Sequence, residues 1–149
     1  MSLNKGKSIQ ISRILRVDPH RAFDLVYDVA HFPSFMPSVT SAEVISDDGD
    51  HKVVEWEMSI DGAPLNWTED IRYNRELLTA DFKALDGMFL HFDGSWRVRA
   101  GENGTELEVS VFYDLGLPEI EEIIGPLLDE RLRQNLDAML ENIETRAGL

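Results

Sequence analysis

Residues 39–115 alternate between apolar and polar side chains with a period of two, which is the pattern of strands with one buried face. Five groups of turn-forming residues divide this stretch, at positions 47–50, 61–62, 74–76, 86–87 and 101–104. Five turns separate six consecutive strands, and each strand can pair with the one before it as an antiparallel meander. Residues 8–17 also alternate and predict one more strand.

A pair of short helical segments is predicted before the meander. Asp18-Pro19 supplies an N-cap and a proline at the first helical position, and apolar residues follow at helical spacing to about Val29. Pro33 and Pro37 then break the chain into a short second helix or a turn.

A long amphipathic helix is predicted after the meander, from about Pro118 to Arg146. Its apolar stripe consists of Ile120, Ile124, Leu128, Leu132, Leu136, Met139 and Ile143. Pro126 follows Gly125 inside this pattern, so we expect a kink or an interruption there.

This one helix has to cover the apolar face of the whole sheet. About seven strands at a spacing of about 4.8 Å form a sheet roughly 30 Å wide, whereas a helix with its side chains is about 10–12 Å across. We therefore expect an α+β fold in which a curved antiparallel sheet wraps around the C-terminal helix. An apolar pocket between them and a tightly packed core remain equal alternatives, and such a pocket is the usual form of a small-molecule site.

The charge balance argues against several kinds of partner. The chain carries 14 Lys and Arg against 28 Asp and Glu, a formal net charge of −14 at pH 7. Nucleic-acid binding draws its affinity from cationic side chains that meet phosphates, so no RNA or DNA partner is expected. The same balance argues against binding to anionic membrane surfaces.

Length and targeting signals indicate a simple organisation. The 149 residues suit one domain, and we expect a single ligand-binding domain over residues 1–149 with a disordered tail at 1–7. The N-terminus lacks the apolar core of a signal peptide, and no stretch approaches the roughly 20 apolar residues of a membrane span. We therefore expect a cytoplasmic protein without stable membrane insertion. Its assembly stays open, with a homodimer as one alternative.

The strand at residues 65–73 breaks the rule that the buried face is apolar. Leu65, Trp67, Ile71 and Tyr73 share one face, and Glu69 lies among them. Burying a lone carboxylate costs several kcal/mol unless it is paired or protonated. Either a bulge or an edge position lets Glu69 reach water, or it is a cavity carboxylate with a raised pKa that hydrogen-bonds a ligand or moves a proton.

The C-terminal helix offers polar groups that could accompany Glu69. Asn135 lies near the middle of the apolar stripe, and Arg131 lies at its edge. Asn135 is either a buried amide satisfied by backbone or water, or it faces the pocket and orients a carbonyl or hydroxyl. Arg131 either reaches solvent or pairs with an acid such as Glu69.

Other chemistries find no support in the sequence. There is no cysteine, which excludes disulfides and thiolate chemistry. The four histidines show no metal-type spacing, so no metal site is expected. No nucleophile elbow, phosphate loop or dinucleotide fingerprint occurs, and we expect no cofactor.

The order of the predicted elements and the segment YDVAHFPSFMP at residues 27–37 resemble the polyketide cyclase and coenzyme Q-binding branch of the START-like, helix-grip superfamily. That branch often reads D-V-x-x-[YFW]-P-x-[FL]-x-P there. DGMF at 86–89 and DGSW at 93–96 are similar to its G-P-F … W segment, and NWT at 66–68 to its tryptophan strand. The resemblance covers residues 8–146. It implies a curved sheet around a C-terminal helix, enclosing a cavity for an aromatic or polyprenyl ligand.

One departure from this resemblance concerns the chemistry. Similar aromatase/cyclases often continue the tryptophan strand as W-[TV]-S-x-R, with the arginine pointing into the cavity. Trp67 and the helix asparagine, Asn135, match that pattern, but Glu69 stands at the serine position and Ile71 at the arginine position. The resemblance therefore supports the fold more strongly than the reaction.

The leading hypothesis is a polyketide cyclase-like domain that binds a hydrophobic molecule and catalyses cyclisation or dehydration of an aromatic polyketide. The alternatives are a non-catalytic carrier of a lipid or quinone and a protein-interaction module. Under the first hypothesis Glu69 is the acid/base, and Asn135 and Tyr73 donate or accept hydrogen bonds. The predicted ligand-binding residues are Phe35, Met36, Trp56, Met58, Trp67, Phe82, Phe92, Trp96, Tyr113, Arg131, Leu132 and Met139.

Overall fold

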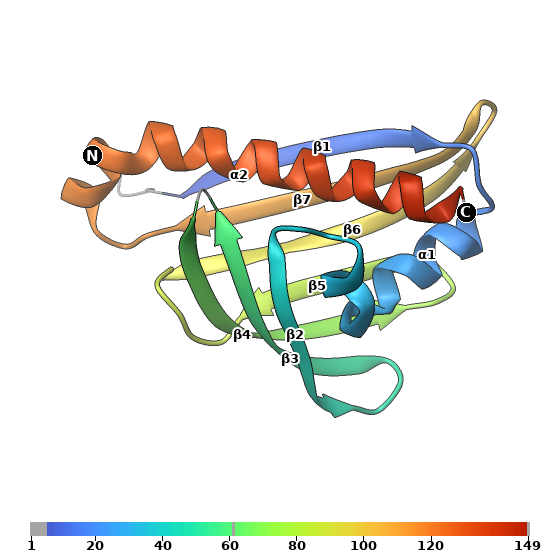
Figure 1. The fold of residues 1–149 in the computed structure, drawn as a ribbon, viewed down its shortest axis with the longest axis horizontal. Helices are drawn as coiled ribbons and strands as arrows, with labels where there is room; N and C mark the ends of the chain where they lie inside the picture. Colours follow the sequence, from blue (N-terminus) through green and yellow to red (C-terminus); the bar gives the residue numbers. More distant parts are fainter. Residues whose placement is uncertain (1–5, 61, 149) are drawn as a thin grey trace.

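The computed structural model describes residues 6–60 and 62–148. These residues form seven strands, two α-helices and one 3-10 helix (Figure 1). Their bounds in chain order are β1 Lys7–Leu15, α1 Pro19–Tyr27, η1 Val29–Ser34, β2 Val39–Asp47, β3 His51–Ile60, β4 Ala63–Asn74, β5 Thr79–Ala84, β6 His91–Gly101, β7 Gly104–Asp114 and α2 Pro118–Ala147.

The strands form one antiparallel sheet in the order β1-β7-β6-β5-β4-β3-β2. Strands β2 to β7 are the predicted meander, and β1 joins its edge by pairing with β7. The expected α+β architecture, a curved sheet around a long C-terminal helix, is thereby confirmed. The predicted tail at residues 1–7 ends too late, because Lys7 already pairs with Tyr113; residues 1–5 lie outside the described part of the chain.

Local signals explain where the first helix begins and ends. The side chain of Asp18 accepts a hydrogen bond from the backbone N–H of His20, and Pro19 occupies the first turn. At the other end, Lys52 Nζ donates to the carbonyl oxygen of Tyr27 at 2.7 Å, which satisfies one of the open carbonyls of the last turn. This bond ties α1 to β3.

Helix α2 continues through Pro126, so the expected interruption is wrong. Proline removes the hydrogen bond to the carbonyl of Glu122, four residues earlier. Both residues lie in an exposed part of the helix, where water can replace the missing donor. The helix can therefore continue past the proline.

The two halves of α2 differ in burial. Its C-terminal half packs against the concave face of the sheet, and Leu140 and Ile143 are both fully buried. Its N-terminal half is open, with Ile123 77% and Leu127 54% exposed, so the predicted apolar stripe is covered only in its later part. Figure 1 shows α2 running nearly the length of the molecule beside β1, with α1 next to its C-terminal end. None of the described helices is both long enough and apolar enough to cross a membrane.

Gly94 marks a very close approach between β6 and β7. A Cβ atom at this position would lie 1.9 Å from the carbonyl oxygen of Ser110 on β7 and 2.8 Å from the ring of Phe82 on β5. A glycine inside a strand commonly marks such a bend or close approach. The curvature that closes the sheet around α2 therefore depends on a missing side chain.

We expect Gly94→Ala to lower the free energy of unfolding by about 2 kcal/mol or more, because the methyl group cannot enter without moving the backbone of β7. Urea unfolding followed by circular dichroism measures this change. Gly101→Ala in the same strand is the matched control, because its Cβ would first meet the carbonyl oxygen of Gly104 at 3.4 Å. That variant should stay within about 0.5 kcal/mol of the wild type. Equal losses in the two variants would contradict the argument.

Candidate functional site

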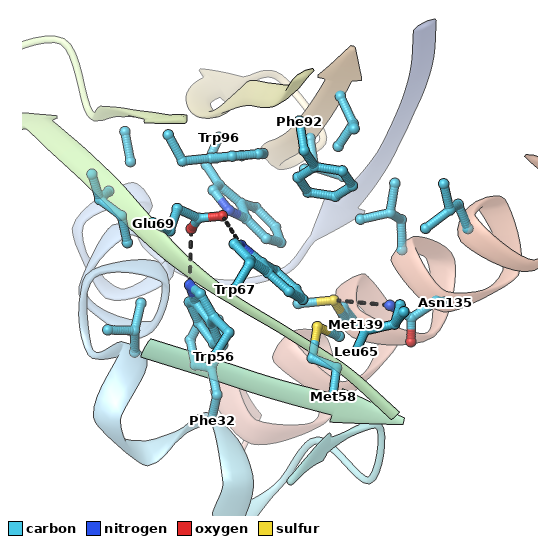
Figure 2. A pocket seen from close by; sticks show the side chains of 18 of the residues that line it. Phe32, Trp56, Met58, Leu65, Trp67, Glu69, Phe92, Trp96, Asn135 and Met139 are labelled. Atoms are coloured by element: carbon cyan, nitrogen blue, oxygen red, sulfur yellow. Dashed lines mark hydrogen bonds between the residues drawn. The ribbon is translucent and has the colours of Figure 1, made fainter. Parts of the chain in front are cut away.

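A cavity lies between the concave face of the sheet and α2 (Figure 2). It leaves about 70 Å³ open to the centre of a water molecule, several times the roughly 10–15 Å³ that one buried water needs. Of the two alternatives from the sequence, a pocket and a tightly packed core, the structure therefore has the pocket. The predicted residues that line it are Trp56, Met58, Trp67, Glu69, Tyr73, Phe82, Phe92, Trp96, Leu132, Asn135 and Met139.

The cavity has a closed end and an open end. Most of its lining side chains are buried, and Glu69 is only 5% exposed. The partly exposed ones are Ile60, Leu65, Trp67, Phe89, Phe92 and Asn135. These residues come from the β3–β4 hairpin, the loop before β6, the start of β6 and the middle of α2, so the mouth lies where these segments meet.

Glu69 is held by two tryptophans. Trp56 Nε1 donates to Glu69 Oε1 and Trp67 Nε1 donates to Glu69 Oε2, each at 3.0 Å. The strand register explains the arrangement: Trp56 pairs directly with Trp67 across β3 and β4, and Glu69 lies two residues beyond Trp67 on the same face. Figure 2 shows both indoles directed toward the carboxylate.

The environment of Glu69 favours its neutral form. Loss of solvent raises the pKa of its carboxyl from about 4.5 to about 7, although the two indole hydrogen bonds pull in the opposite direction. Because Glu69 is only 5% exposed, the alternative that it reaches water is wrong. Among the described residues, no cation contributes to the pKa of Glu69, so the predicted pairing with Arg131 is not formed; Arg131 contacts Glu130 and Gln134 on α2.

Aromatic rings form the wall around this carboxylate. Trp56 and Trp67 are stacked, with ring centroids 6.2 Å apart and an angle of 25° between the planes. Phe92 lies 5.6 Å from Trp67, and Phe32 of η1 lies 5.7 Å from Trp56. The wall thus runs from η1 across several strands. A planar apolar group can stack on these rings without breaking polar contacts of the protein.

The two predicted hydrogen-bonding partners of a ligand occupy different places. Tyr73 lines the closed part of the cavity, and its hydroxyl lies 3.5 Å from the carbonyl oxygen of Tyr27; burial raises the pKa of this phenol. Asn135 lies at the mouth, on the other side of Trp67 from Glu69 (Figure 2), and its amide contacts Met139 Sδ at 3.7 Å. Glu69 and Asn135 therefore do not act on one atom of a small ligand.

Four predicted ligand-binding residues do not line the cavity. Met36 is fully buried in the core, and Phe35 faces a separate surface pocket beside Arg146. Tyr113 lies beyond the cavity, where its hydroxyl donates to Asp129 of α2 at 2.9 Å. Arg131 contacts side chains of its own helix, as described above.

Sequence reasoning also missed several lining residues. They are Val26, Val29, Phe32, Ile60, Leu65, Ile71, Ala80, Phe89, Val109, Val111 and Leu136. Those on strands follow the same alternation as the predicted ones, so the pattern contained their signal. Phe89 lies in a loop, where no periodicity indicates a direction. Among residues 6–60 and 62–148, no three His, Asp or Glu side chains are grouped so that they could hold a metal ion.

A family model described as polyketide cyclase / dehydrase and lipid transport matches residues 15–140. The chain belongs to this family. Within curated proteins, it is 24% identical over 121 residues to the ribosome association toxin RatA of Rickettsia prowazekii, covering 79% of this chain and 83% of that protein.

Several solved structures share the fold at low sequence identity. TTHA0849 from Thermus thermophilus superposes with a TM-score of 0.88 at 22% identity, covering 95% of this chain and 97% of that one. The Zhui aromatase/cyclase from Streptomyces sp. R1128 also gives a TM-score of 0.88, at 14% identity, covering 96% of this chain and 94% of that one. The resemblance to the START-like, helix-grip fold is thereby confirmed.

The raised pKa of Glu69 links stability to pH. The folded protein holds this proton up to about pH 7, whereas the unfolded chain releases it near pH 4.5, so stability falls as pH rises through this window. Between pH 5 and 8 the linkage lowers the free energy of unfolding by roughly 2 to 3 kcal/mol. Glu69→Gln should remove this part of the pH dependence. Between pH 5 and 8, the free energy of unfolding of the variant should therefore rise relative to that of the wild type by roughly the same 2 to 3 kcal/mol.

Urea unfolding at several pH values between 5 and 8 measures the effect. The matched control is Glu57→Gln, an exposed glutamate on β3 that should follow the wild-type profile. Parallel profiles for Glu69→Gln and the wild type would show that Glu69 is ionised throughout and would contradict the argument.

Proposed function

We propose that this chain binds a hydrophobic small molecule with an aromatic or polyprenyl body in the cavity under α2. The observation that carries the proposal is an internal void lined almost entirely by apolar and aromatic side chains, with one carboxylate at its closed end. Ligand pockets typically combine such walls with a few polar groups that fix orientation. The family to which the chain belongs supports the same function.

Flexible side chains allow the cavity to admit a ligand larger than its present void. Met58 and Met139 both line the cavity and are buried. Methionine has three rotatable side-chain bonds and adapts to irregular shapes. Rotation of these two side chains enlarges the space between β3 and α2 without moving the backbone.

Filling the cavity should weaken ligand binding. Leu132→Trp places an indole in the void, so it should weaken binding of a neutral fluorescent naphthalene by at least about tenfold, roughly 1.4 kcal/mol. Ala138→Trp adds the same side chain on the exposed side of α2 and should leave the affinity within about twofold. Fluorescence titration measures both. Equal affinities for the two variants would place the probe outside the cavity.

A second candidate is catalysis of cyclisation or dehydration, with Glu69 as the acid/base. The observation that favours it is the pKa of about 7, which suits proton transfer near neutral pH. The cavity would contribute by folding a flexible chain into a reactive conformation, a largely entropic effect. The non-catalytic alternative is a carrier that presents a lipid or a quinone to another protein.

Glu69→Gln separates the enzyme from the carrier. As an enzyme, the wild type should convert a linear poly-β-ketone thioester into a ring-closed or dehydrated product, and the variant should lose this turnover while its affinity stays within about tenfold. Mass spectrometry detects the loss of water on dehydration, and chromatography separates a ring-closed isomer of unchanged mass from the linear substrate. Glu57→Gln, which changes an exposed carboxylate, should retain wild-type turnover. The absence of any product with the wild type would favour the carrier.

A third candidate is docking to another macromolecule, which the name of the RatA relative raises for the ribosome. The net charge of −14 argues against contacts with ribosomal RNA, because the phosphates of RNA attract cationic surfaces. It also leaves the cavity without a role. Ligand binding therefore accounts for more of the molecule.

A further inference from the structure

Within the described part of the chain, the carboxylate of Glu69 has hydrogen-bond donors but no counter-charge. It is 5% exposed, and its two oxygens each accept one indole N–H. No ion pair of the described residues includes it, and no cation contributes to its pKa. A buried charge without a partner is strongly disfavoured.

The nearby cations serve other contacts. Lys52 Nζ donates to the carbonyl of Tyr27 and lies 3.6 Å from the centre of its ring. Arg75 lies over the same ring at 4.3 Å, and Arg131 contacts side chains of α2. The positive charge that would complete the Glu69 site therefore does not come from the described part of this chain.

The geometry around Glu69 nevertheless suits its ionised form. An ionised carboxylate accepts hydrogen bonds at both oxygens and donates none, and here an N–H group is aimed at each oxygen. Such donors stabilise the anion relative to the neutral acid. The hydrogen-bond donors thus suit an ionised Glu69, but in the empty cavity no positive charge from the described residues balances it.

The surrounding rings add to the attraction for a cation. Trp56 and Trp67 contact Glu69 directly, and Tyr73 and Trp96 line the same cavity. The face of an aromatic ring attracts a cation, most strongly for tryptophan, and the attraction increases when water is excluded. A carboxylate inside an aromatic cavity is therefore complementary to an organic cation.

We infer that the ligand is an amphipathic amine, with a protonated or quaternary nitrogen beside Glu69 and an apolar body along the aromatic wall toward Asn135 at the mouth. This inference rests on the binding function proposed above and names the class of ligand. The nitrogen supplies the missing counter-charge, and a protonated amine can also donate to a Glu69 oxygen without displacing either indole. A neutral ligand of the same shape leaves the carboxylate uncompensated.

A matched pair of ligands tests the inference. 2-(2-Naphthyl)ethylamine is a cation at pH 8, and 2-(2-naphthyl)ethanol has the same ring and chain without the charge. Calorimetric titration of the wild type at pH 8 and physiological salt should give at least about tenfold tighter binding for the amine. In Glu69→Gln the preference should fall to within about threefold, whereas Glu57→Gln should keep it.

Proton release provides a second readout on the unmodified protein. At pH 6 Glu69 is largely protonated when the cavity is empty, and Tyr73, the other titratable side chain in the described lining, stays neutral. Binding of the amine should then release close to one proton per ligand, measured by titration in buffers with different ionisation enthalpies. Binding of the alcohol should release none.

The outcomes separate this inference from the proposed function. Equal affinity of the wild type for amine and alcohol would overturn the inference while the cavity function stands, and so would amine binding without proton release in a protein whose stability profile shows Glu69 protonated at pH 6. An amine preference that survives in Glu69→Gln would place the cation elsewhere on this acidic protein and would overturn it as well. Failure of both ligands to bind would overturn the inference and the proposed function together.

Discussion

The whole structure depends on the mismatch between a wide sheet and a single narrow helix. Seven strands present their apolar side chains to α2, which covers only part of that surface. The sheet reduces the uncovered area by curling, and Gly94 permits this because β7 approaches it more closely than any side chain allows. The remaining gap is the cavity. Its existence is therefore a result of the architecture, whereas its chemistry is set by the few residues that face it.

Among those residues, Glu69 determines what the cavity can bind. Two indoles orient the carboxylate, aromatic rings exclude water from it, and no cation of the described chain neutralises it. These contacts oppose each other, since the donors favour the anion and the loss of solvent favours the neutral acid. The balance lies close to neutral pH, so a modest contribution from a ligand decides the charge of the site.

Much of this could be predicted from the sequence, and the failures have physical reasons. Alternation placed Glu69 among apolar neighbours, because the direction of a strand side chain depends only on its position in the strand. It could not identify Trp56 as a partner, because cross-strand register depends on how the hairpin turn is made. Phe89 and Tyr113 show the same limit: a loop residue has no period, and a residue near a strand end can lie past the cavity.

The uneven burial of α2 also has a dynamic consequence. Its first turns have few apolar contacts, as the exposure of Ile123 and Leu127 shows, while Leu140 and Ile143 anchor the other end. Segments with few buried contacts open locally at a lower free energy than the whole domain unfolds. Gly116, just before these turns, lies against Leu90, the neighbour of Phe89 at the mouth. Fraying of the helix start therefore costs less free energy than global unfolding, and the anchored half keeps the domain folded while the first turns open.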